Sequence, residues 1–83
     1  NKLRIEEVVV PNMNPLVGKS LRAVDFRGRL GALVLAVRDD TDGYQFNPGP
    51  DFVVKAGATL IVMAHAEEIL RLRNGIMAGT LGR

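Results

Sequence analysis

The sequence contains no cysteine and no tryptophan, and aromatic residues make up only 5% of it. The lack of cysteine excludes a disulfide scaffold, a thiol nucleophile and zinc sites built from thiolates, and it is compatible with a reducing compartment. No apolar run approaches the roughly 20 residues that a membrane-spanning helix needs. We therefore expect no direct insertion into a membrane.

Charge of one sign is not in large excess either. Eleven Lys and Arg residues oppose nine Asp and Glu residues, which gives a net charge of +2. This balance argues against a nucleic-acid-binding arm and against a polybasic membrane patch. Nucleic acid is therefore not an expected partner.

The composition that is present is that of an ordinary globular domain, with 47% hydrophobic and 24% charged residues in 83 positions. We expect one domain over residues 1–83. The chain begins at Asn1 rather than at methionine and shows no signal segment, so we expect a domain cut from a longer protein.

Apolar and β-branched stretches alternate with turn residues along the chain. The predicted strands are Leu3–Val10, Ala32–Val37, Tyr44–Phe46 and Thr59–Ala64, with a short strand-like stretch at Phe52–Val54. The predicted helices are Leu21–Arg27, which Ser20 caps and Gly28 ends, and Ala66–Met77. This order predicts an α+β domain, with a mixed sheet and its helices on one face.

The unbroken apolar strands also bear on partners. Strands of this kind usually have both faces covered, and two helices can cover only one face of such a sheet. The second face, or the edge of Ala32–Val37, is therefore expected to meet another chain. A homodimer is the natural solution.

Two motifs resemble ligand loops but lack required positions. Gly18-Lys19-Ser20 would end a phosphate-binding loop, yet the glycine needed five residues earlier is Met13. The acidic turn Asp39–Gly43 resembles a calcium loop, but its first and last ligand positions would be Arg38 and Gly49. We interpret the first motif as a turn and a helix cap. The second is a solvated turn or, as the less favoured alternative, a weak divalent-cation site.

The chain offers no set of residues for catalysis. His65 is the only histidine, and we interpret it as a partly buried residue where a strand meets a helix. The adjacent pairs Glu6-Glu7 and Glu67-Glu68 point their carboxylates in different directions, so neither forms an acid–base dyad. We expect no enzyme activity and no metal site.

A cationic cluster surrounds the first predicted helix. Its members are Lys19, Arg22, Arg27 and Arg29. These side chains could bind a phosphate group, because guanidinium and ammonium groups donate strong hydrogen bonds to phosphate oxygens. On composition alone, a solvated helix face is the favoured alternative.

An ordered set of segments resembles the TrkA C-terminal domain, the C-terminal lobe of the domain regulating conductance of potassium. The segments are Leu16–Leu21, Val34–Arg38, Asn47-Pro48, Gly57 with Leu60–Val62, and Glu67–Leu70. The likeness extends from Ile5 to Leu72 and implies a small β-α-β-β-β-α fold, in agreement with the elements predicted above.

The resemblance also implies a function. In bacterial potassium channels and uptake proteins, this lobe follows a Rossmann-type lobe on the cytoplasmic side, dimerises, and binds small regulators that bias a membrane pore. We therefore expect a cytoplasmic regulatory, ligand-sensing module of an inner-membrane protein or a membrane-associated complex. The alternative is the effector-sensing domain of an antiporter, another transporter or a transcription regulator.

Some members of this family bind cyclic di-AMP at the dimer interface of the lobe. The resemblance implies that Arg27 contacts phosphate, that Leu21 and Pro48 supply apolar contacts, and that Arg22 adds to the positive field. Leu33 stands where nucleotide-binding relatives carry an asparagine for the base. The expected ligand is cyclic di-AMP or another small anionic effector.

Overall fold

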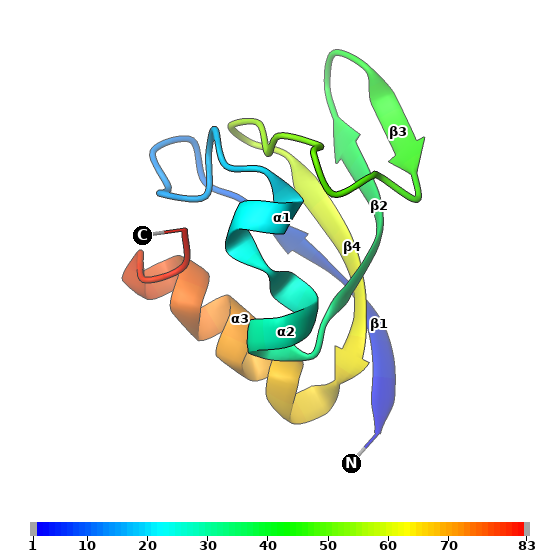
Figure 1. Ribbon diagram of the computed structural model, residues 1–83, viewed down its shortest axis with the longest axis vertical. Helices are drawn as coiled ribbons and strands as arrows, with labels where there is room; N and C mark the ends of the chain where they lie inside the picture. The colour runs from blue at the N-terminus through cyan, green and yellow to red at the C-terminus, as the bar shows by residue number, and fades with distance from the viewer. Residues whose placement is uncertain (1, 83) are drawn as a thin grey trace.

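The computed structural model describes residues 2–82 as a four-stranded sheet with helices packed on one face (Figure 1). The strands are β1 (Leu3–Val9), β2 (Leu33–Asp39), β3 (Gly43–Phe46) and β4 (Thr59–His65). The helices are α1 (Leu21–Val24), α2 (Phe26–Leu30) and α3 (Ala66–Ala78). The predicted α+β class is confirmed.

The sheet is antiparallel throughout, with strand order β1-β4-β2-β3, so the prediction of a mixed sheet was wrong. Strands β1 and β2 do run in the same direction, as the intervening helices suggested. They are not neighbours, because β4 lies between them and runs opposite to both. A parallel pair therefore never forms.

The first predicted helix is in fact two short helices. Ser20 caps α1 as expected, since its Oγ accepts a hydrogen bond from the Ala23 N–H at 3.1 Å. The chain then breaks at Asp25, which has a left-handed backbone (φ 56°, ψ 57°). The Asp25 carboxylate accepts from the Gly28 N–H at 3.1 Å and starts α2, so Gly28 lies inside a helix and does not end one.

The stretch predicted at Phe52–Val54 is not a strand of the sheet. Val53 forms an isolated bridge with Ser20, and the Leu21 N–H donates to the Phe52 carbonyl at 2.9 Å. The segment thereby ties the start of α1 to the loop that follows β3. Further hydrogen bonds join Val54 to Gly18 and Lys19, so the stretch pairs with the chain before α1 and not with the sheet.

The core lies between the sheet and the helices. Leu60 and Val62 of β4 are fully buried and point toward the helices, as the two-residue alternation of a strand requires. The helices contribute Phe26, Leu30, Ile69, Leu72 and Ile76 to the same cluster. Burial of these side chains stabilises the fold.

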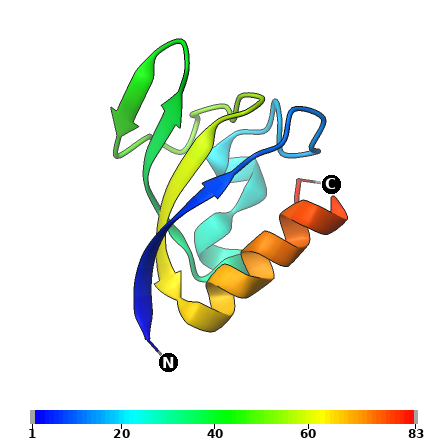
Figure 2. The same cartoon turned by 180° about the vertical axis from the view of Figure 1, so that it is seen from behind.

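Residues 2–82 leave the second face of the sheet uncovered (Figure 2). Apolar side chains form two rows across this face, one of Ile5, Met63 and Leu33 and one of Ile61, Ala36 and Phe46. Ile5 is 62% exposed and Phe46 is 75% exposed. The expectation that the helices would cover only one face is therefore confirmed.

Candidate ligand-binding site

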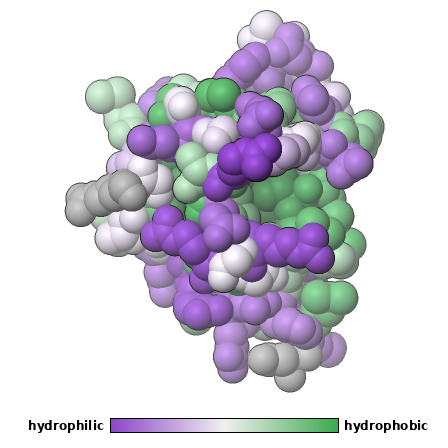
Figure 3. Space-filling model, viewed as in Figure 1, coloured by the Kyte–Doolittle hydropathy of each residue, from purple (hydrophilic) through white to green (hydrophobic). Residues whose placement is uncertain are grey.

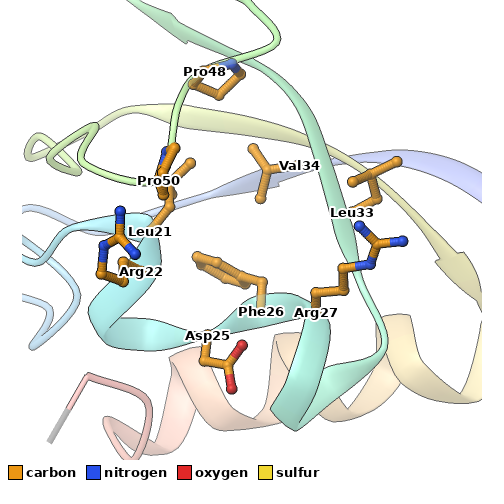
Figure 4. A pocket seen from close by; sticks show the side chains of 9 residues that line it. All are labelled: Leu21, Arg22, Asp25, Phe26, Arg27, Leu33, Val34, Pro48 and Pro50. Carbon is orange, nitrogen blue, oxygen red and sulfur yellow. The ribbon is translucent and has the colours of Figure 1, made fainter.

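The four residues expected to bind a ligand line one pocket, which lies between α1, α2 and the beginning of β2 (Figure 4). The volume of this pocket is about 350 Å³. Its lining residues are Leu21, Arg22, Asp25, Phe26, Arg27, Leu33, Val34, Pro48 and Pro50. In the space-filling view, a hydrophobic hollow lies between hydrophilic side chains on this side of the molecule (Figure 3).

Backbone hydrogen bonds hold α1 against the loop that carries the two prolines. The Arg22 N–H donates to the Pro50 carbonyl at 2.8 Å. The break at Asp25 then changes the direction of the chain, and Phe26 and Arg27 enter the pocket lining from α2. The pocket therefore depends on two short helices, which a single continuous helix would not reproduce.

The interior of the pocket is apolar. Phe26 is only 3% exposed, and Leu21 and Val34 are half-buried against the core. Pro48 and Pro50, from the loop after β3, line the pocket on the side away from Arg27 (Figure 4). Such a surface can pack against the flat face of a nucleobase or another apolar ring.

The two arginines of the pocket differ in their partners. The Arg22 Nε donates to the Asp51 carboxylate at 3.2 Å, so part of its charge is already paired. The guanidinium of Arg27 makes no hydrogen bond or ion pair with any other residue in the range 2–82, and the backbone carbonyl of Arg27 accepts from the Gly31 N–H at 3.0 Å. The side chain of Arg27 is exposed and can bring all its donors to a ligand. It is the cation best placed to bind an anion at this pocket.

Other features were missed or misjudged from the sequence. Asp25, Phe26, Val34 and Pro50 also line the pocket, whereas Lys19 and Arg29 of the cationic cluster do not. Aspartate is a favoured helix N-cap, as Asp25 is for α2, but it is also common on helix surfaces, so its identity is only a weak signal for the break. Leu33 reaches the rim and is 40% exposed.

Lys55 of the same chain pairs with two carboxylates of the acidic turn after β2. Lys55 Nζ lies 2.6 Å from the Asp42 carboxylate and 4.0 Å from that of Asp39. The Asp42 N–H donates to Asp39 at 2.6 Å and is the main reason why the pKa of Asp39 lies below its usual value. The carboxylates of Asp39 and Asp42 are therefore already paired with a cation of the chain.

His65, the residue before α3, is exposed, so the expectation of partial burial was wrong. Its backbone N–H donates to the Glu68 carboxylate at 2.9 Å.

Membrane spans are a separate question. Among residues 2–82, every helix falls short of the length and apolar character that crossing a membrane requires.

The fold and the pocket together define a small α+β lobe with a ligand-sized cavity beside its short helices, and the comparison with protein families assigns this lobe to a class. The TrkA-C domain model matches residues 5–76, and the chain belongs to this family of regulatory, non-catalytic domains. The chain is also 28% identical over 72 residues to a probable potassium channel protein of Methanocaldococcus jannaschii. That alignment covers 87% of this chain and 21% of the channel protein, so the chain spans about a fifth of this relative.

Solved structures share the fold. The RCK_C domain dimer of S. agalactiae BusR in complex with c-di-AMP superposes with a TM-score of 0.79 at 19% identity, over 89% of this chain and 96% of the BusR chain. The RCK C domain of the potassium transport protein KtrA in complex with c-di-AMP gives 0.74 at 19% identity, over 87% and 84% of the two chains. BusR bound to promoter DNA also matches, with 35% of that chain covered.

Proposed function

We propose that this chain is the regulatory lobe, over residues 1–83, of a longer potassium channel or potassium transport protein. It binds a small anionic effector in the pocket and pairs with a second copy. The proposal is supported by the family, by the potassium channel relative and by the pocket itself. The remaining parts of the protein would be a Rossmann-type lobe and a membrane pore, with this lobe on the cytoplasmic side.

The observation that carries the proposal is an arginine side chain that lies beside an apolar pocket and has no ion-pair partner among residues 2–82. Arg27 would donate to a phosphate oxygen through its planar guanidinium group. Leu21, Phe26 and Pro48 would pack against a base. Cyclic di-AMP has both phosphates and bases. Two solved domains of the same fold are in complex with it.

A second copy would complete the site. Strand β3 pairs with Ala36–Asp39, so Leu33 and Val34 have no strand on their outer side within residues 2–82. The pocket lies next to this open stretch. Cyclic di-AMP consists of two identical halves, so two symmetry-related pockets could each take one half. The BusR domain of this fold is a dimer with c-di-AMP, which supports this arrangement.

Regulation would follow from the difference between two arrangements of the dimer. An effector shifts such an equilibrium only if it binds one arrangement more tightly than the other. The typical coupling free energy is about 1–3 kcal/mol. This lobe would thus bias the pore without any chemical step.

Calorimetric titration of cyclic di-AMP into the 83-residue chain tests the proposal. We expect saturable binding to the wild type, weakened by about 1.5–3 kcal/mol, roughly ten- to a hundredfold, in Arg27→Ala. Arg71→Ala is the matched control, because Arg71 is an exposed arginine of α3 that does not line the pocket. Equal affinity in the wild type and Arg27→Ala would contradict the site. Absence of binding to the wild type would contradict cyclic di-AMP as the ligand, and binding gained in Leu33→Asn would then show that Leu33 is the cause.

The second candidate is the effector-sensing domain of a transcription regulator, an antiporter or another transporter. The likeness to BusR, which was solved with promoter DNA, favours the first of these. The residues before Asn1 in the parent protein distinguish the two classes. A helix-turn-helix there would support a regulator, whereas apolar helices and a Gly-rich βαβ unit would support a channel.

A further inference from the structure

Strand β1 forms one outer edge of the sheet, with β4 on its inner side (Figure 2). The hydrogen bonds show which of its backbone groups are used. The Ala66 N–H donates to the Lys2 carbonyl, and the Val10 N–H donates to the Ala58 carbonyl. Even-numbered residues of β1 therefore bond to β4, and the groups of Leu3, Ile5, Glu7 and Val9 point outward.

This outward edge is long and largely open. Leu3, Ile5 and Val9 are each about 60% exposed, at 60%, 62% and 59%. Within residues 2–82, the only hydrogen bond to an outward backbone group of this edge comes from Arg73, which donates to the Glu7 carbonyl at 3.0 Å. An open edge of seven residues is a template for pairing with another strand.

The order of charged residues along β1 favours pairing with a second copy of the same strand, because positive and negative side chains then face each other. Within one chain, the Glu6 carboxylate lies 2.9 Å from Arg73 and 3.7 Å from Arg4, and both pairs are partly exposed. In an antiparallel pair around a two-fold axis at Ile5, Arg4 of each copy also lies directly opposite Glu6 of the other. Both then occupy positions where opposing side chains are close. Ile5 pairs with Ile5, and Leu3 pairs with Glu7.

Every neighbouring register is worse. An axis at Arg4, Glu6 or Glu7 sets that residue opposite its own copy, and an axis at Leu3 sets Arg4 opposite Lys2. All four put like charges in direct opposition, which destabilises a strand pair. The Ile5-centred register avoids this and also joins the outward backbone groups of both strands.

The surface beside the edge is suited to the same partner. Met77 is 86% exposed and lines a groove of about 300 Å³ with Val9 and Pro11. Leu70 is 59% exposed and lies two helical turns earlier on the same side of α3. Pairing of β1 with its copy would bring this apolar strip against the second molecule.

We propose that a second copy of this chain pairs antiparallel with β1, with the two-fold axis at Ile5, and extends the sheet to eight strands. This interface lies at the other end of the sheet from the effector pocket and does not rest on effector binding. A lobe with both interfaces could join dimers into larger assemblies.

Disulfide cross-linking tests the register, because the wild-type chain has no cysteine. In Ile5→Cys the two sulfurs would face each other across the axis, with Cα atoms about 5.5 Å apart, a separation at which disulfides form. In the control Val9→Cys, at a position of similar exposure, the two cysteines would lie roughly 27 Å apart. We expect mild oxidation to give a covalent dimer of Ile5→Cys and not of Val9→Cys. Equal cross-linking of the two variants, or none in Ile5→Cys, would overturn the proposal.

A charge exchange tests the pairing of Arg4 with Glu6. Arg4→Glu and Glu6→Arg should each weaken self-association by about tenfold, and an equimolar mixture should restore it, because opposite charges again face each other. Circular dichroism shows whether each variant is folded, and Arg71→Glu and Glu67→Arg control for the changes in net charge. No recovery in the mixture of folded variants would contradict the interface. Titration with cyclic di-AMP is a separate measurement, so a failure of the effector site leaves this result unaffected.

Discussion

The two faces of the sheet have similar apolar side chains but very different surroundings. On the helix-covered face, Leu60 and Val62 have no exposed surface. On the open face, Ile5 and Phe46 keep more than half of theirs. Both faces follow from the same alternation along the strands, so hydrophobicity alone does not tell them apart.

The difference separates two roles that one small sheet has to fill. The covered face binds the helices and so fixes the fold, and its residues cannot be changed without loss of packing. The open face and the outer strand edges contribute little to the stability of one chain. They remain available for contacts with another molecule.

The largest expected change in the free energy of unfolding comes from a substitution on the helix-covered face. Leu60→Ala should lower the free energy of unfolding by about 2–5 kcal/mol, because it leaves a cavity in the core. Ile5→Ala, on the open face, should change it by no more than about 0.5 kcal/mol at concentrations where the chain is monomeric. Urea unfolding followed by circular dichroism measures both. Similar losses in the two variants would mean that the open face is buried in the stable form of the chain.

A smaller effect concerns the helices that build the covering layer. Ser20→Ala removes the hydrogen bond from the Ala23 N–H to Oγ and should cost about 1 kcal/mol. Ser20→Thr keeps the hydroxyl and serves as the control, with a loss of a few tenths of a kcal/mol at most. If both variants lost the same stability, capping by the hydroxyl would not be the cause.

The smallest effect lies in the turn beyond β2, at the edge of the open face. Amide donors, above all the N–H of Asp42, hold the pKa of Asp39 below its usual value of 3.8. A lowered pKa in the folded state adds stability above the unfolded pKa, and this stability is lost as the pH falls through the folded value. Acidification below about pH 4 should therefore destabilise the wild type more steeply than Asp39→Asn. Identical slopes in thermal melts over this range would contradict this account of the turn.

Much of the fold could be predicted from the sequence, because strand and helix patterns are local. Runs such as Thr59–Ala64 and the apolar stripe of α3 identify their elements without knowledge of the partners. The strand order could not be predicted in the same way, since the placement of β4 between β1 and β2 depends on packing of the whole chain. The break at Asp25 was missed because a left-handed residue stabilised by its own carboxylate looks like an ordinary polar helix position.

The candidate site also has features that the sequence could predict and features that depend on the folded chain. The family likeness brought Arg27 and Pro48 together, and the structure places both in one pocket. Sequence alone could not show that Arg22 is paired with Asp51 while Arg27 has no such partner among residues 2–82, because the pairing joins segments 29 residues apart. The charge available to a ligand is thus a tertiary property.

The most direct test of the central claim is whether effector binding and pairing of the lobes are coupled. Sedimentation equilibrium of the 83-residue chain, with and without saturating cyclic di-AMP, measures this coupling. A ligand shared by two pockets should tighten self-association by about 5- to 150-fold, the range that corresponds to 1–3 kcal/mol. At a cyclic di-AMP concentration that saturates the wild type but not Arg27→Ala, the variant should show a smaller shift. A wild-type dissociation constant that is the same with and without cyclic di-AMP would contradict the account.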